Sequence, residues 1–264
     1  MIPFLDRLEQ ANNVLIAGCG GERINPTTWR VDRTAAEIPY FPERWLGEWL
    51  ARHERTAPIY AFAKSGVRPL AAAYRWIIEQ HHIDLVVLVD GGTDSILFGD
   101  EPGLGTVVED AVSIIAANSA TEGQALLAAI GFGIDHFHGV SHHAFLENVA
   151  RLTSDGGFLG AFSLSPGTAE AAAFLDLVDY ANQRQPMHPS IVCNSIASAL
   201  RGEFGNYHAT NRTSGSDLFV NPLMSQYWAF DVPRRPPHGL CRPARGNGAD
   251  GGGQPGDRIL PAND

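Results

Sequence analysis

The feature that most constrains the fold is Ile83–Asp110, in which a short apolar run leads into a glycine-rich, acidic loop. The run Leu85–Val89 has the length of a buried strand and ends at Asp90, and a helix is expected to begin at Thr106. A strand, a polar loop and a helix in this order are typical of an open α/β sheet. Ligands bind such sheets at the carboxyl ends of the strands, because backbone N–H groups and helix N-termini are unpaired there. The loop is therefore the centre of a predicted small-molecule site.

The same alternation of strands and helices continues through most of the chain. Further strands are expected at residues 14–17, 58–62, 125–132 and 157–164, and helices from residue 42 and over 67–81, 106–118, 141–152, 168–182 and 189–200. Such alternation predicts a mainly parallel sheet with helices on both faces. We therefore predict a single α/β domain over residues 1–231, doubly wound and Rossmann-like. Its strand ends near Gly18, Asp90, Gly131 and Ser163 are expected to share one edge.

The sequence changes character after Asp231. Residues 232–264 contain six prolines, seven glycines and no aromatic side chain. A segment of this composition cannot bury enough apolar surface to offset the entropy lost on ordering. We therefore predict a disordered tail over residues 232–264, rich in Pro, Gly and Arg.

Composition excludes several classes of partner. The net charge of −10 argues against a nucleic-acid or acidic-membrane surface, which needs clustered Lys and Arg. The three cysteines are isolated and lack CxxC spacing, so neither a disulfide framework nor a zinc knuckle is indicated. No apolar run approaches the roughly 18 residues of a membrane span. We expect a cytoplasmic protein with a small-molecule ligand and no nucleic-acid or membrane partner, and we leave homo-oligomerisation open.

The glycine-rich loop supplies the predicted substrate-binding residues that follow the central strand. These residues are Asp90, Gly91, Gly92, Thr93 and Asp94. Their carboxylates suit Mg²⁺, which prefers oxygen ligands and often bridges to substrate phosphates, so Mg²⁺ is the candidate cofactor although the metal itself is unknown. Asp and Gly also build turns, and this structural role is favoured for Asp100 and Glu101. Likewise, Thr106 and Glu109 match a capping box at the start of the next helix.

The predicted catalytic residues follow the strand at 125–132. They are Asp135, His138 and His142, with Ser141 as the expected N-cap of a helix. Histidine titrates near neutral pH and is the commonest metal ligand, so this group could carry out acid–base chemistry or bind a transition metal. Structural hydrogen bonding is the third alternative.

Three polar residues in the last third of the chain complete the predicted substrate-binding set: Asn194, His208 and Arg212. A guanidinium group can bind two oxygens of a carboxylate or phosphate at once, which suits Arg212 to an anionic ligand. A surface-loop contact is an equally good interpretation of Arg212. The GxSxG elbow of serine hydrolases is absent from the sequence, so nucleophilic hydrolysis is not indicated.

Five longer segments carry a family resemblance. They are AGCGG at 17–21, YFPERWLGEWL at 40–50, VDGGTDSILFGDEPGLGT at 89–106, GFGIDHFHGVSHHAFLENVARLT at 131–153 and HPSIVCNSIASALRGEFGNYH at 188–208. Together they resemble the prokaryotic family known as domain of unknown function 1152, over nearly all of residues 1–231. The resemblance implies no particular reaction. The chain departs from the family where Glu22–Val31 replaces a strand–helix unit, and again where the tail begins.

These observations predict an enzyme that acts on a small polar metabolite, phosphorylated or nucleotide-like, at the carboxyl edge of the sheet. The alternatives are a metabolite- or nucleotide-binding protein without catalysis, and an inactive, shortened member of the family.

Overall fold

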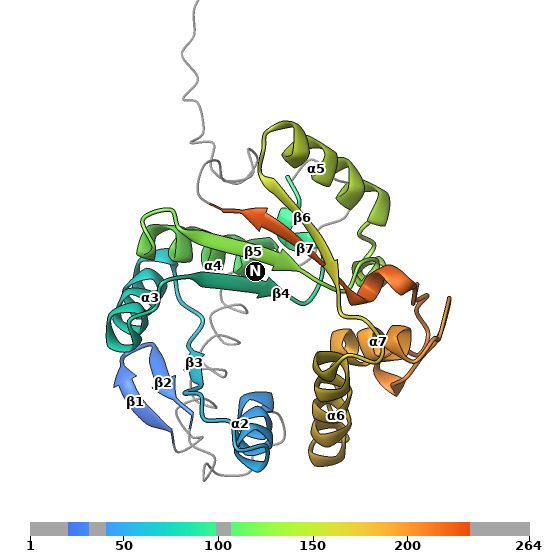
Figure 1. Cartoon of the computed structure of the whole chain (residues 1–264), viewed down its shortest axis with the longest axis horizontal. Coiled ribbons are helices and arrows are strands. Elements are labelled where there is room, and N and C mark those ends of the chain that lie inside the picture. Colours follow the sequence, from blue (N-terminus) through green and yellow to red (C-terminus); the bar gives the residue numbers. More distant parts are fainter. Residues whose placement is uncertain (1–20, 32–40, 99–106, 233–264) are drawn as a thin grey trace, which may run out of the picture.

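The protein is described by a computed structural model over residues 21–31, 41–98 and 107–232, without the side chains of residues 107–108 and 137–138 (Figure 1). The strand predicted at Val14–Ala17 and the strand end near Gly18 lie outside these residues, as does the predicted tail beyond Val232. The loop acids Asp100 and Glu101 also lie outside them, and so does Thr106 of the expected capping box.

The larger sheet contains four strands in the order β4-β5-β7-β6. Strand β4 (Val86–Asp90) pairs in parallel with β5 (Ala125–Ala129), whereas β7 (Gln226–Asp231) runs antiparallel to both β5 and β6 (Phe158–Ser163). Two of its three strand pairings are thus antiparallel, and the prediction of a mainly parallel sheet is wrong. The cause is β7, a strand that was not predicted from the sequence and that inserts between two strands running the same way.

A second, smaller sheet contains three antiparallel strands. Strands β1 (Glu22–Asn25) and β2 (Thr28–Arg30) form a hairpin, and β3 (Tyr60–Phe62) pairs with β2. The Asn25 side chain stabilises the hairpin turn by accepting a hydrogen bond of 2.9 Å from the backbone of Thr27. The strand predicted at 58–62 therefore exists but belongs to this sheet. The α/β class is confirmed, as a mixed α/β structure.

Six helices occur within the described ranges. They are α2 (Pro42–Arg52), α3 (Val67–His81), α4 (Val107–Ala120), α5 (His142–Ser154), α6 (Ala169–Arg184) and α7 (Ile191–Leu200). The helix predicted from residue 42 and those predicted over 67–81 and 141–152 are confirmed, and Ser141 caps α5 by accepting a hydrogen bond from the backbone of His143. None of these six helices is long and apolar enough to cross a membrane.

The main core lies on one face of the larger sheet, beneath α4 and α5. Phe145 of α5 is fully buried there, with the rings of Phe132 and Trp228 at centroid distances of 5.6 and 5.3 Å. On the opposite face, the β4 side chain Val89 is 62% exposed and the β6 side chain Phe162 is 59% exposed. The described helices therefore bury one face of this sheet more completely than the other.

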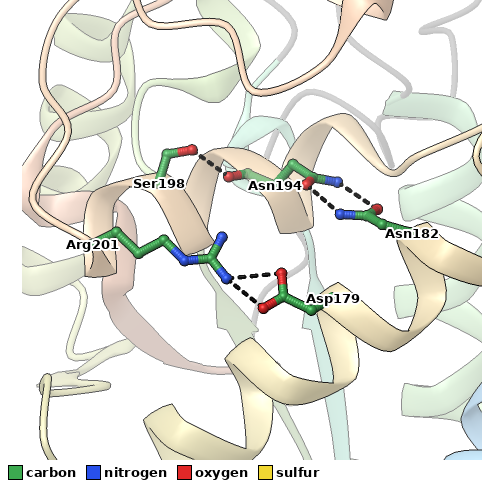
Figure 2. Close-up of polar contacts among 5 residues, drawn as sticks. All are labelled: Asp179, Asn182, Asn194, Ser198 and Arg201. Atoms are coloured by element: carbon green, nitrogen blue, oxygen red, sulfur yellow. Dashed lines mark hydrogen bonds and ion pairs between the residues drawn. The ribbon is translucent and has the colours of Figure 1, made fainter.

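Polar contacts fix α7 against α6 (Figure 2). The side chains of Asn182 and Asn194 exchange two hydrogen bonds of 2.8 and 3.1 Å, and the guanidinium of Arg201 donates two bonds of 2.8 Å to Asp179. Held in this way, α7 lies with Val192 against the turn after β4, where its Cγ1 would be 3.3 Å from a Cβ added at Gly91. The helix pair thus reaches the edge of the sheet at which the predicted site lies.

We predict that Phe145→Ala lowers the free energy of unfolding by about 3–5 kcal/mol, because it leaves a cavity at a fully buried position. Urea denaturation measures this change. The matched control, Phe204→Ala, removes a ring that is 69% exposed and should cost less than about 1 kcal/mol. Equal costs for the two variants would contradict this assignment of the core.

Candidate functional site

The candidate site is at the edge where β4 and β5 end together. Asp90 is the last residue of β4 and pairs with Ala129, the last residue of β5. Strand β6 runs in the same direction as β5, because both are antiparallel to β7, so Ser163 lies at this edge too. The predicted convergence of the chain near Asp90, Gly131 and Ser163 is therefore confirmed.

Hydrogen bonds join the loop after β4 to the segment after β5. The backbone N–H and the hydroxyl of Thr93 donate bonds of 2.6 and 2.8 Å to Oδ2 of Asp135. Asp94 begins the short helix η1 (Asp94–Ile96), and Asp135 lies in η2 (Ile134–His138). Both side chains are buried, with 4% and 9% of their surface exposed. The Asp135 carboxylate thus packs against the acidic loop.

Three aspartates at this edge could share one cation. Asp90, Asp94 and Asp110 each offer a carboxylate oxygen, and these oxygens all lie within 4.8 Å of one another. Asp110 comes from the first turn of α4, and its Oδ2 atom is buried with no hydrogen-bond partner in the described part of the chain. A buried oxygen without a partner costs free energy unless a cation or a proton satisfies it.

Gly92 allows the carboxylates to approach this closely. A Cβ at this position would lie 3.0 Å from Oδ1 of Asp135 and 3.2 Å from Oδ1 of Asp94. Since any larger residue would push these oxygens away, the glycine is needed for space at this position. These two distances show that the Asp135 carboxylate lies beside Asp94 of the three-aspartate group.

Burial and mutual repulsion raise the pKa values of two of these acids. Burial, followed by the negative charges of Asp90 and Asp94, raises the pKa of Asp110 from 3.8 to about 8. Burial is also the main cause that raises the pKa of Asp90 to about 6, although a hydrogen bond with Ser95 works in the opposite direction. A bound divalent cation would offset the free-energy cost of burying these carboxylates close together, because its positive charge neutralises their negative charges.

The donor set suits a hard cation. All the ligand atoms are carboxylate oxygens, which Mg²⁺ and Ca²⁺ prefer. Across the residues that the structure describes, no histidine or cysteine joins the group, so the nitrogen and sulfur ligands that favour zinc are missing from it. The residues present therefore fit Mg²⁺, the candidate cofactor predicted from the sequence.

Neither predicted catalytic histidine belongs to this carboxylate group as the structure describes it. His142 is the first residue of α5, and its ring packs between Phe132 and Phe219 at centroid distances of 5.9 and 5.2 Å. Its Nδ1 atom is buried without a hydrogen-bond partner within the described ranges. The side chain of His138 lies outside the described residues. A shared catalytic role of these histidines with Asp135 stays a prediction.

The other predicted substrate-binding residues already make contacts within the protein. Asn194 belongs to the amide pair of α6 and α7, and His208 shares a hydrogen bond of 2.8 Å with the hydroxyl of Thr213. The exposed guanidinium of Arg212 donates a bond of 2.9 Å to the carbonyl of Pro189, just before α7. Gly91 lies against Val192 of the same helix. A role of these residues in binding a substrate stays a prediction.

Asp110 is the residue that sequence reasoning missed. The acid pair Glu109–Asp110 lies in the first turn of α4, and the sequence pattern predicts Glu109 as half of a capping box. Glu109 forms an ion pair with Lys64, while Asp110 faces the strand end. The capping box stays a prediction, because Thr106 lies outside the described residues. Two adjacent acids at the start of a helix could have indicated a further ligand at this edge, but the sequence does not show which of them turns toward the sheet.

The family of the chain follows from its match to one family model. The model described as protein of unknown function (DUF1152) matches residues 20–234. The chain belongs to this family. The matched range of this DUF1152 protein includes every strand and helix described above, from β1 to β7. No curated protein and no solved structure matches the chain. The chemistry must therefore be inferred from the site itself.

We predict that Asp110→Asn stabilises the protein at alkaline pH in the presence of EDTA. Because the folded-state pKa is raised, the folded state holds more protons than the unfolded state between about pH 4 and 8, and stability is lost as pH rises through this window. The substitution should raise the free energy of unfolding by roughly 1–3 kcal/mol at alkaline pH, a value reduced for the partial exposure of the group, and by less near pH 5.

Urea denaturation at the two pH values measures this effect. The control is Glu109→Gln, which removes an exposed neighbouring acid and should change stability little at either pH. A gain for Asp110→Asn that is equal at both pH values, or absent, would show that repulsion and burial do not act on this carboxylate.

Proposed function

We propose that this DUF1152 protein is an enzyme that binds a divalent cation at Asp90, Asp94 and Asp110 and acts on a polar, anionic metabolite, phosphorylated or nucleotide-like. The observation that carries the proposal is the approach of three carboxylates to within 4.8 Å of one another, at the edge where β4 and β5 end. The buried, unpartnered Oδ2 of Asp110, within the described residues, supports a bound cation further.

The anionic character of the metabolite follows from charge. The acidic group alone would repel a phosphate or carboxylate, whereas a bound Mg²⁺ ion commonly contacts substrate phosphates. When bound, the ion supplies positive charge that attracts and polarises the anionic group. The protein supplies the turn at Gly91 and Gly92, where the absence of side chains lets a ligand approach the backbone. Arg212 is the proposed second contact for the anion.

The catalytic part of the proposal assigns acid–base chemistry to Asp135, His138 and His142. Among them, Asp135 has the best-supported position, because its carboxylate lies beside the proposed cation ligands and is held by Thr93. The histidines would supply a group that titrates near neutral pH. The proposal requires only the edge shared by β4 and β5. It does not require a doubly wound, Rossmann-like fold, which stays a prediction.

The second candidate is a metabolite-binding protein without catalysis. It is favoured by the position of the His142 ring between two phenylalanines and by the structural hydrogen bond of His208. Both observations suggest that these histidines stabilise the fold. An inactive member of the family is the third candidate, and it predicts that no cation binds.

We predict that Mg²⁺ raises the thermal stability of the protein with a saturable dose dependence. A cation that binds only the folded state stabilises it by about 2.7 kcal/mol when its free concentration is about 100 times Kd. Asp90→Asn and Asp94→Asn should each weaken Mg²⁺ binding by about tenfold or more, because each removes a charged ligand. Thermal melts and isothermal titration of the full chain measure both effects.

The matched control is Asp155→Asn, which removes an exposed acid at the end of α5. It should leave Mg²⁺ binding unchanged. If Mg²⁺ stabilises none of these proteins, or all of them equally, the proposed cation site is wrong. To separate the candidates, the Mg²⁺-loaded protein is incubated with phosphorylated metabolites and nucleotides, and products are followed by mass spectrometry. Turnover supports the enzyme, whereas binding without turnover supports the second candidate.

We predict that Gly92→Ala also weakens Mg²⁺ binding by about tenfold, without removing any ligand. The new Cβ would press on the carboxylates of Asp94 and Asp135 and displace them. Gly66→Ala is the control, because a Cβ there meets nothing within 4 Å. Unchanged Mg²⁺ affinity in Gly92→Ala would mean that the cation does not depend on this arrangement of carboxylates.

A further inference from the structure

A cavity of about 310 Å³ lies between α2, α6 and α7, away from the strand ends. This volume is at the lower end of the range for small-molecule sites. Most of its wall is apolar and comes from α2 and α6: Pro42, Leu46, Phe174, Leu177, Val178 and Ala181. A ligand that fills this space must therefore bring an apolar body of modest size.

The polar groups in the wall include several hydrogen-bond acceptors. Glu43 contributes a carboxylate from the first turn of α2. Gln185 is only 6% exposed, and its Oε1 atom is buried with no hydrogen-bond partner in the described part of the chain. The carbonyl oxygens of Asn182 and Asn194 also belong to lining residues, and each accepts one bond from the other residue. Of these amide oxygens, Oε1 of Gln185 is the one without a donor among the described residues, and a donor from a ligand would satisfy it.

The Glu43 carboxylate has no counter-charge among the described residues. No ion pair joins it to a cationic side chain within the described ranges, whereas the neighbouring acid on the same helix, Glu48, lies 3.6 Å from Arg184. Consistent with this, burial raises the pKa of Glu43 above its ordinary value. A positive charge inside the cavity would relieve the cost of burying this acid.

We propose that this cavity binds a small organic amine, with its ammonium group at the Glu43 carboxylate and the Gln185 amide oxygen and its hydrocarbon part against the apolar wall. An ammonium group has three N–H donors and a positive charge, which suits the acidic Glu43 side chain and the unpartnered Oε1 atom of Gln185. A neutral ligand of the same shape would leave the carboxylate without a counter-charge.

This site is additional to the proposed cation site. The two sites lie on different sides of α7, because Val192 contacts the turn at Gly91 while Cys193 and Asn194 line the cavity. The amine site therefore makes no use of the acidic group at the strand ends. Either site can fail its test while the other is retained.

The test compares 2-phenylethylamine with 2-phenylethanol, which has a similar shape but no charge. Titration calorimetry or ligand-observed NMR with the full chain should show binding of the amine, with an affinity at least about tenfold higher than that of the alcohol, because an ionic hydrogen bond is involved. Glu43→Gln should abolish this preference. Glu170→Gln, a change at an exposed acid of α6, should preserve it.

A second variant and a chemical readout locate the bound amine. Ala181→Leu adds volume to the wall of the cavity and should lower the affinity for the amine by about tenfold or more. Circular dichroism verifies that each variant is folded. The amine should also slow alkylation of Cys193 by iodoacetamide, measured by peptide mass mapping, because this thiol lines the cavity. Absence of amine binding, equal binding of amine and alcohol, or unchanged preference in Glu43→Gln would each overturn the proposal.

Discussion

The parallel pairing of β4 with β5 is the constraint on which the candidate site depends. It aligns the end of one strand, at Asp90, with the end of the next, and so brings together loops that are distant in sequence. Two hydrogen bonds then join Thr93 to Asp135, which is 42 residues away in the sequence. Each interaction that draws the loops together also concentrates negative charge. The same geometry that builds the site therefore creates an electrostatic cost.

Local structure was predictable because short-range interactions determine it. The helix at Val67–His81 has the predicted bounds, and α5 begins after the predicted Ser141 cap. Apolar periodicity and capping act over a few residues, so the sequence displays them directly. The shared edge near Asp90 and Gly131 was predictable for a related reason. Two apolar strands joined by a helix tend to pair in parallel, and their carboxyl ends then meet.

Long-range pairing was not predictable in the same way. Strand β7 (Gln226–Asp231) is only six residues long, and only tertiary contacts with β5 and β6 decide that it inserts between them. The hairpin of β1 and β2 was missed because its strands are only four and three residues long. In the site, Asp110 was missed because a helix N-terminus explains an acid equally well whether or not it turns toward the sheet.

The contrast between paired and unpaired acids is what links the two proposed sites. On the surface, Asp179 is matched by Arg201 and Glu109 by Lys64, although solvent alone would stabilise these charges. In less accessible positions, where a counter-charge is needed more, the described residues provide none for Glu43 and leave Oδ2 of Asp110 without a hydrogen bond. Selection for stability alone would favour the opposite distribution of charges. The distribution is explained if cations from solution, a metal ion at one site and an amine at the other, supply the positive charge that the chain does not.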